Sequence, residues 1–139
     1  MRPLLRDPLR CIVPHGWPAP AHGVMTPAAM RGQKFVIQGE STDADIQNYL
    51  KKYRIETHSC CRVVDDMSNI AMVEAGVGIA LLPQLVLHGC TAAVDIWPLE
   101  PQEARIIGLS RPNTAAPAPA AEQMEQYIVE YCAQRPDAI

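Results

Sequence analysis

The run from Val63 to Pro83, VVDDMSNIAMVEAGVGIALLP, constrains the fold of this chain more than any other segment. Asp65 and Asp66 can cap the start of a helix, and Gly76 can end that helix in a left-handed conformation. The next residues, Val77 to Leu82, are apolar on both faces, which suits a parallel strand covered by helices on both sides. The closing proline fits the first turn of a further helix. The run therefore predicts a helix followed by a parallel strand, as in an α/β domain.

The composition fits one α/β domain and argues against nucleic-acid binding. The 139 residues are enough for a single domain with its own core. Aliphatic residues supply most of the 48% hydrophobic content, whereas aromatic residues make up 5%. The net charge is −3, and the 12 lysines and arginines are scattered, so no basic face is expected. We therefore expect no direct contact between this chain and DNA.

The five cysteines follow no spacing that predicts a disulfide framework or a metal site. Cys60 and Cys61 are adjacent and would point to opposite faces of a strand, so that only Cys60 shares a face with His58. Two ligands fall short of the three or four that zinc requires, and we expect no metal ion and no other cofactor. No secretion signal precedes the cysteines, and no apolar run approaches the roughly 20 residues that span a bilayer. We therefore expect a cytoplasmic protein without membrane contact.

Apolar spacing, capping residues and prolines predict the remaining elements. Strands are expected over residues 6–13, 33–38, 55–64, 77–82, 92–99 and 104–110. Helical segments are expected over residues 27–30, 43–54, 66–75, 83–88 and 120–132. One apolar stripe should face the core from the second helix; it consists of Ile46, Tyr49, Leu50 and Tyr53. The last helix repeats this spacing with Met124, Tyr127, Ile128 and Tyr131.

The order of these motifs resembles the effector-binding domain of LysR-type transcriptional regulators. The resemblance is carried by DPLRCIVPHGWPAPAHG, TPAAMRGQKFVIQGES, EAGVGIALLP and ARIIGLSRPN, followed by the terminal amphipathic helix. It extends from about Leu5 to Cys132. It implies an α/β fold that is periplasmic-binding-protein-like (type 2). In that fold a three-layer α/β/α subdomain with a mixed sheet is joined to a C-terminal strand and helix from the partner subdomain.

The resemblance also implies how the chain is divided. Residues 1–13 would form an N-terminal segment with the first crossover strand, 14–95 the second subdomain, 96–103 the second crossover, 104–132 a remnant of the first subdomain, and 133–139 a frayed tail. No motif matches the winged helix-turn-helix or the first half of the first subdomain. The chain is therefore expected to be a truncated regulator, and DNA binding would belong to the missing N-terminal domain.

The function implied by the resemblance is the sensing of a small molecule in the cleft between subdomains, and no enzymatic activity is expected. The turns 39–42 and 65–68 match those at which the family contacts its effector. Free N–H groups at helix N-termini independently favour an anion or a carboxylate. The candidate ligand-binding residues are Glu40, Ser41, Thr42, Met67, Ser68 and Gly78. The effector would be a small organic acid or an amino-acid-like compound.

Each candidate also has a structural interpretation. Ser41 and Thr42 can cap their helix, and Gly78 can permit a close approach between strands. Met67 and Met72 are expected to fill the core in preference to contacting a ligand. The two aspartates of the second turn would repel a strongly anionic ligand. Either they cap the helix and point away, or the effector carries a cationic or hydroxyl group.

The sequence is also compatible with two alternative functions. A stand-alone solute-binding or interaction domain would share the same fold. A small Cys/His enzyme is the more distant alternative, because no histidine lies in a motif such as GxSxG and His58 beside Cys60 is not a positioned dyad. The missing half-subdomain would leave strand edges and apolar helix faces exposed, so we expect a homodimer.

Overall fold

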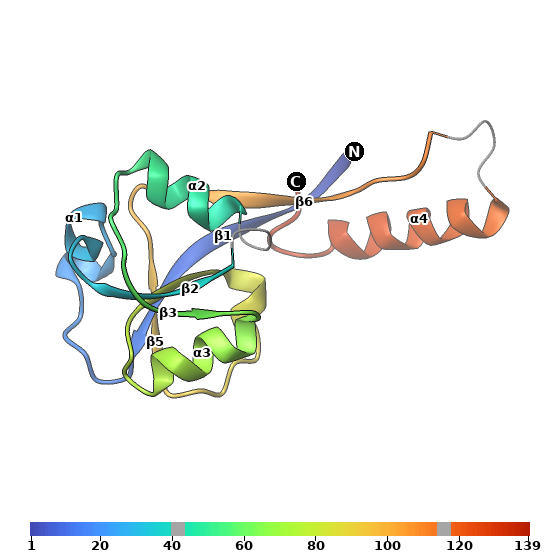
Figure 1. Cartoon of the computed structure of the whole chain (residues 1–139). Coiled ribbons are helices and arrows are strands. Elements are labelled where there is room, and N and C mark those ends of the chain that lie inside the picture. The colour runs from blue at the N-terminus through green and yellow to red at the C-terminus, as the bar shows by residue number, and fades with distance from the viewer. Residues whose placement is uncertain (40–43, 114–117) are drawn as a thin grey trace. The chain divides into compact units, whose positions relative to one another are not determined.

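The computed structural model describes residues 1–39, 44–113 and 118–139, apart from the side chains of Ser59 and Cys60 (Figure 1). The strands are β1 (Arg2–Pro14), β2 (Lys34–Gln38), β3 (His58–Val63), β4 (Ala80–Pro83), β5 (Val94–Pro98) and β6 (Ala104–Leu109). The helices are α1 (Pro27–Met30), α2 (Ala44–Lys52), α3 (Asp66–Glu74) and α4 (Pro119–Ala133), with 3-10 turns η1 (Ala21–Gly23) and η2 (Gln84–Leu87). Every expected element is therefore present, and most boundaries agree within one to three residues.

Contacts divide the chain into two compact units. The larger unit is Pro8–Ala104, and the smaller unit combines Met1–Asp7 with Arg105–Ile139. The chain passes between them twice, once within β1 and once at the start of β6. The subdomain boundaries expected from the sequence stay a prediction.

The strands of the larger unit form mixed sheets. β2 and β3 are parallel, and Gln38 and Val63 are their last paired residues. Ile79, which precedes β4, joins β2 through a parallel bridge with Phe35. β4 is antiparallel to β1, and β1 is antiparallel to β5. The carboxyl ends of β2, β3, β4 and β5 consequently lie toward one edge of this strand array.

The segment 77–82 differs from the parallel strand expected for it. Only Ile79 pairs in parallel, whereas β4 pairs antiparallel with β1 and includes Pro83, which was expected to begin a helix. Pro83 instead precedes η2 as its capping residue. A strand buried on both faces has the same apolar pattern whichever way its neighbours run, so the pattern does not reveal their direction. β1 also begins at Arg2, earlier than the expected start at Arg6.

Two apolar cores cover the two faces of these strands. Leu9, Cys11 and Leu81 belong to the core that includes residues of α1 and α2. Ile12 and Leu82 belong to the core that includes α3 and η2. Neighbouring strand residues point to opposite faces, which is why continuous apolar runs supply both cores. With α2 and α3 on opposite sides of the strands, the expected three-layer α/β/α arrangement is confirmed (Figure 1).

The helices bury the expected face in α2 but not in α3. The apolar stripe of α2 is buried in the first core, with Tyr53 packed against it. In α3 the buried residues are Asn69, Ile70 and Val73, whereas Met67 and Met72 are 75% and 38% exposed. The expectation that these two methionines fill the core is therefore wrong. They lie on the helix face that points away from the sheet.

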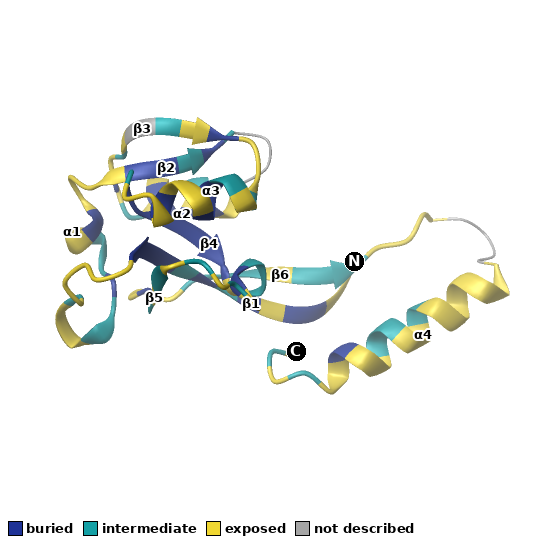
Figure 2. Cartoon of the chain, turned by 90° about the horizontal axis from the view of Figure 1, so that it is seen from below, coloured by how far each residue is buried: buried dark blue, intermediate teal, exposed yellow. Residues whose placement is uncertain are grey.

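Strand pairing joins the two segments of the smaller unit. β6 pairs with β1, and a Cβ at Gly108 would lie 2.8 Å from the backbone oxygen of Arg2. Residues 133–139 differ from the frayed tail expected for them, because Ile139 N–H donates to Leu4 O at 3.0 Å and Arg6 N–H donates to Asp137 O at 2.8 Å. α4 exposes most of its surface (Figure 2). None of the helices in the described residues is long and apolar enough to cross a membrane.

Candidate functional site

The carboxyl ends of β2 and β3 lie side by side, and each leads into a helix. Gln38 pairs with Val63 at this edge, β3 leads through residues 64 and 65 into α3, and β2 leads toward α2. The first N–H groups of a helix lack partners within the helix, and its dipole places partial positive charge at the same end. Two neighbouring helix starts therefore make this edge suited to a ligand that offers hydrogen-bond acceptors.

Asp65 caps the start of α3 as the sequence predicts. Its Oδ1 accepts a hydrogen bond from the backbone N–H of Ser68 at 2.7 Å, and its Oδ2 accepts one from the Ser68 hydroxyl at 3.2 Å. These bonds stabilise the carboxylate and hold the pKa of Asp65 below its ordinary value. Asp66 accepts a hydrogen bond from the buried amide of Gln38, which ties α3 to the end of β2.

Asn69, in the first turns of α3, is a site feature that the sequence analysis missed. Its side chain is buried, and among the described residues its Oδ1 has no hydrogen-bond partner. A buried amide oxygen normally accepts a hydrogen bond, so this atom is an exception in the packing of α3 against the strands. A polar residue on the predicted core face of a helix is the only signal that could have indicated it.

The candidate residues do not all come together. Ser68 lies at the edge formed by β2 and β3, and Met67 precedes it with an exposed side chain. Gly78 lies at the opposite end of β2, where an added Cβ would stand 2.4 Å from the backbone oxygen of Lys34. Three candidates lie outside the described residues: Glu40, Ser41 and Thr42.

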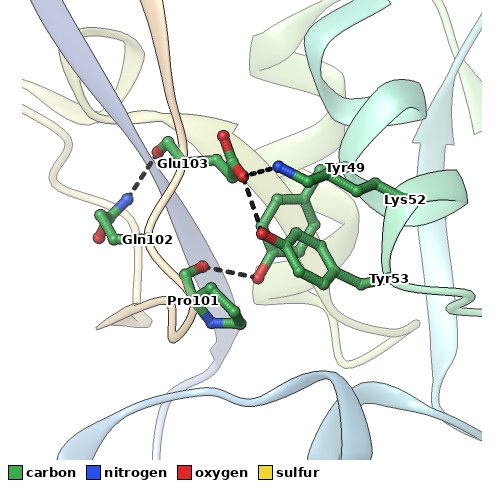
Figure 3. Close-up of polar contacts among 6 residues, drawn as sticks. All are labelled: Tyr49, Lys52, Tyr53, Pro101, Gln102 and Glu103. Carbon is green, nitrogen blue, oxygen red and sulfur yellow. Dashed lines mark hydrogen bonds and ion pairs between the residues drawn. The ribbon is translucent and has the colours of Figure 1, made fainter.

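The other end of α2 is fastened to the segment that follows β5 (Figure 3). The Tyr49 hydroxyl donates to Pro101 O at 3.1 Å, and the Tyr53 hydroxyl donates to the Glu103 carboxylate at 2.8 Å. Lys52 forms an ion pair with the same carboxylate. Hydrogen bonds to Glu103 raise the pKa of both Lys52 and Tyr53. These contacts fix the direction of α2, and with it the position of its N-terminal end.

A second polar group lies near the same edge and was also missed. Arg10 of β1 pairs with Leu82 of β4, and its guanidinium donates to the side chains of Gln84 and Gln102. Both glutamines follow the carboxyl ends of strands, β4 and β5 respectively. The sequence feature that could have indicated this polar group is an arginine within an otherwise apolar stretch of strand.

Two observations on the described residues concern metal binding and cysteine chemistry. No group of three or more His, Cys, Asp or Glu side chains among them could hold a metal ion. Burial raises the pKa of the Cys11 thiol to about 12, so that this cysteine stays protonated and is a poor nucleophile.

We expect Asp65→Ala to destabilise the protein at neutral pH and to have a smaller effect in acid. The folded-state pKa of Asp65 lies below its ordinary value of 3.8, so its contribution is fully present above that value and is lost as the pH falls through the folded pKa. Thermal unfolding of the wild type and of Asp65→Ala, measured from neutral pH down to a pH below the folded-state pKa of Asp65, tests this expectation. Asp65→Asn is the matched control, because an amide still caps but does not titrate. A deficit of Asp65→Ala that is unchanged in acid would contradict the assignment.

The sequence matches the family model for the LysR substrate binding domain over residues 1–133. The effector binding domain of QuiR in complex with shikimate has a similar structure, with a TM-score of 0.80, 17% identity, and coverage of 96% of this chain and 65% of that chain. The regulatory domain of Synechocystis PCC6803 CcmR in complex with 2-PG has a TM-score of 0.75, 15% identity, and coverage of 96% and 66%. The reduced form of OxyR has a TM-score of 0.69, 23% identity, and coverage of 94% and 61%.

A search of the curated proteins gave no match. The chain spans less than two thirds of the length of each of the three similar structures. These similarities confirm the expected fold, an α/β effector-binding domain of the periplasmic-binding-protein-like type. Since the family match includes almost the whole sequence, the chain belongs to the LysR substrate binding domain family.

Proposed function

We propose that this chain is the effector-binding part of a LysR-type transcriptional regulator and that a small molecule binds at the carboxyl edge of β2 and β3. The observation that carries the proposal is the pairing of Gln38 with Val63, which brings the starts of two helices to one edge. The similar domains of QuiR and CcmR hold shikimate and 2-PG, which supports a small-molecule ligand here.

The chemistry at the start of α3 indicates what this part of the site can offer. Asp65 and Asp66 are engaged by Ser68 and Gln38, so their charges are already stabilised by hydrogen-bond donors. We assign ligand contacts to Ser68 and Met67 here, and to Glu40, Ser41 and Thr42 at the start of α2. Such a site suits a small organic acid or amino-acid-like effector that also carries a donor group.

Gly78 serves the fold, on this proposal, and does not contact the ligand. Its place at the opposite end of β2 and its contact with the Lys34 backbone support a packing role.

The proposed regulator acts in the cytoplasm as a homodimer, and its DNA contacts come from a separate N-terminal domain. The support for self-association is α4, on which Met124, Tyr127 and Tyr131 form an exposed apolar line. Large exposed apolar patches are typical of protein interfaces. Size-exclusion chromatography with light scattering measures the mass, and a monomer at micromolar concentration would contradict this part of the proposal.

Thermal unfolding with a panel of small acids, amino acids and aromatic compounds, shikimate among them, tests the ligand site. We expect at least one compound to raise the unfolding temperature, because a ligand that binds only the folded state stabilises it. Ser68→Ala should reduce this shift, whereas Ser110→Ala, which alters a serine of the smaller unit, should not. A panel without any effect would contradict the proposal.

Enzymatic turnover is a separate test. Turnover of ester or peptide substrates that Cys60→Ala abolishes would contradict a purely regulatory role.

A further inference from the structure

We propose that Arg10 binds a carboxylate group of the effector, an inference that rests on the proposed ligand-binding function. The guanidinium is held in place before any ligand arrives. Its Nε and Nη2 donate to Gln84 Oε1 at 2.9 and 2.6 Å, and its Nη1 donates to Gln102 Oε1 at 3.2 Å. Both acceptors are neutral amide oxygens, so they orient the positive charge without cancelling it.

Gln102 is itself oriented by the backbone. Its Nε2 donates to Leu9 O at 3.1 Å and to Glu103 O at 2.6 Å, which turns Oε1 of the same amide toward Arg10. A guanidinium has five N–H donors, and the three bonds to the glutamines leave two without an acceptor among the described residues. One of these is on Nη1 and the other on Nη2. A carboxylate accepts such a pair of donors through its two oxygens.

The charges around Arg10 support an external anion. In the described ranges no carboxylate forms an ion pair with Arg10. The carboxylate of Glu103, close by in sequence to Gln102, is engaged by Lys52 and Tyr53. Arg10 is also half-buried, and an ion pair shielded from water is stronger than one on an open surface.

The position of Arg10 places this charge at the edge of the proposed site. Gln84 follows β4, and β4 continues the segment that pairs in parallel with β2. The carboxyl ends of β2 and β4 therefore point the same way, and Arg10 lies at that end of β1 because β1 runs antiparallel to β4. Arg10 would bind an acidic group of the ligand, and the remainder of the ligand would face the starts of the helices that follow β2 and β3.

The test compares acids with their amides on the wild type and on three variants. The probe pairs are benzoate with benzamide and succinate with succinamide, and inorganic phosphate is a third anion. Arg10→Gln removes the charge, Arg10→Lys keeps the charge but not the two-pronged geometry, and Lys51→Gln is the control that removes an exposed charge from α2. Unfolding temperature and titration calorimetry are measured for each protein.

We expect an acid to bind the wild type and Lys51→Gln, with its amide bound much more weakly. Arg10→Gln should weaken the acid by about tenfold or more, and Arg10→Lys by less. Equal binding of acid and amide, or equal binding of acid by wild type and Arg10→Gln, would overturn this inference and leave the proposed function standing. Preferential binding of phosphate would overturn the carboxylate assignment. Binding of no probe, together with no response to the broader panel of small molecules, would contradict both proposals.

Discussion

We expect Gly78→Ala to lower the free energy of unfolding by about 3 kcal/mol, which is large for the addition of one methyl group. The new Cβ would stand 2.4 Å from Lys34 O and 2.9 Å from Lys34 C. Both atoms belong to the backbone, so the clash cannot be relieved by rotating a side chain. Lys34 O also accepts the hydrogen bond from Ile79 N–H at 2.9 Å, which joins the segment before β4 to β2. Urea unfolding followed by circular dichroism measures the loss.

Gly39→Ala is the matched control for this prediction. Apart from its chain neighbours, none of the described residues has a heavy atom within 4 Å of the Cβ that it adds, and the φ of Gly39 lies outside the left-handed region. We expect its unfolding midpoint to stay close to that of the wild type. Equal midpoints for the Gly39 and Gly78 variants would show that the strands can separate at no cost.

The helices could be predicted from the sequence because their signals are local. The α3 helix begins after Asp65 and ends before Gly76, whose φ is +83°, as the capping residues predict. The apolar spacing of α2 also identified its buried face. A cap or a stripe depends on residues three or four apart, which the chain itself keeps close together.

Strand direction and some burial could not be predicted, because they depend on distant partners. The apolar segment before and within β4 reads the same whether β1 runs parallel or antiparallel to it. In α3 the sheet contacts the face that carries Asn69, so Met67 is exposed although methionine is usually a core residue. Hydrophobicity alone does not show which face of a short, largely apolar helix is turned inward.

Only the part of the candidate site that depends on local sequence signals could be predicted. The turn at Asp65 and Ser68 was found because its capping signal is local. The contacts of Arg10 with Gln84 and Gln102 join residues 74 and 92 positions apart, and only the strand pairing brings them together. No sequence motif could indicate that these three residues meet, because their contact depends on the strand topology.

We expect Arg105→Met to destabilise the smaller unit by about 2 to 4 kcal/mol, because it removes the cation from a buried carboxylate. Arg105 Nε lies 2.8 Å from Asp7 Oδ2, and the Asp7 side chain is fully buried. The other buried side chains that the structure describes in this unit are apolar or nearly so: Leu4, Leu5 and Cys132. With so small a core, one buried ion pair contributes a large share of the stability. Hydrogen exchange of the α4 amides measures the opening of this unit.

Arg111→Met is the matched control, since it removes an arginine of the same unit. Arg111 forms an ion pair with Glu125, but its side chain is 61% exposed. Exposed pairs contribute about 1 kcal/mol or less, so its exchange should remain close to the wild type. The double variant Asp7→Leu/Arg105→Met should recover much of the loss, because an apolar pair needs no charge compensation. Equal exchange in the Arg105 and Arg111 variants would mean that strand pairing alone holds β6 against β1. Faster exchange in Arg105→Met alone would show that the buried ion pair between Asp7 and Arg105 is needed to keep β6 paired with β1.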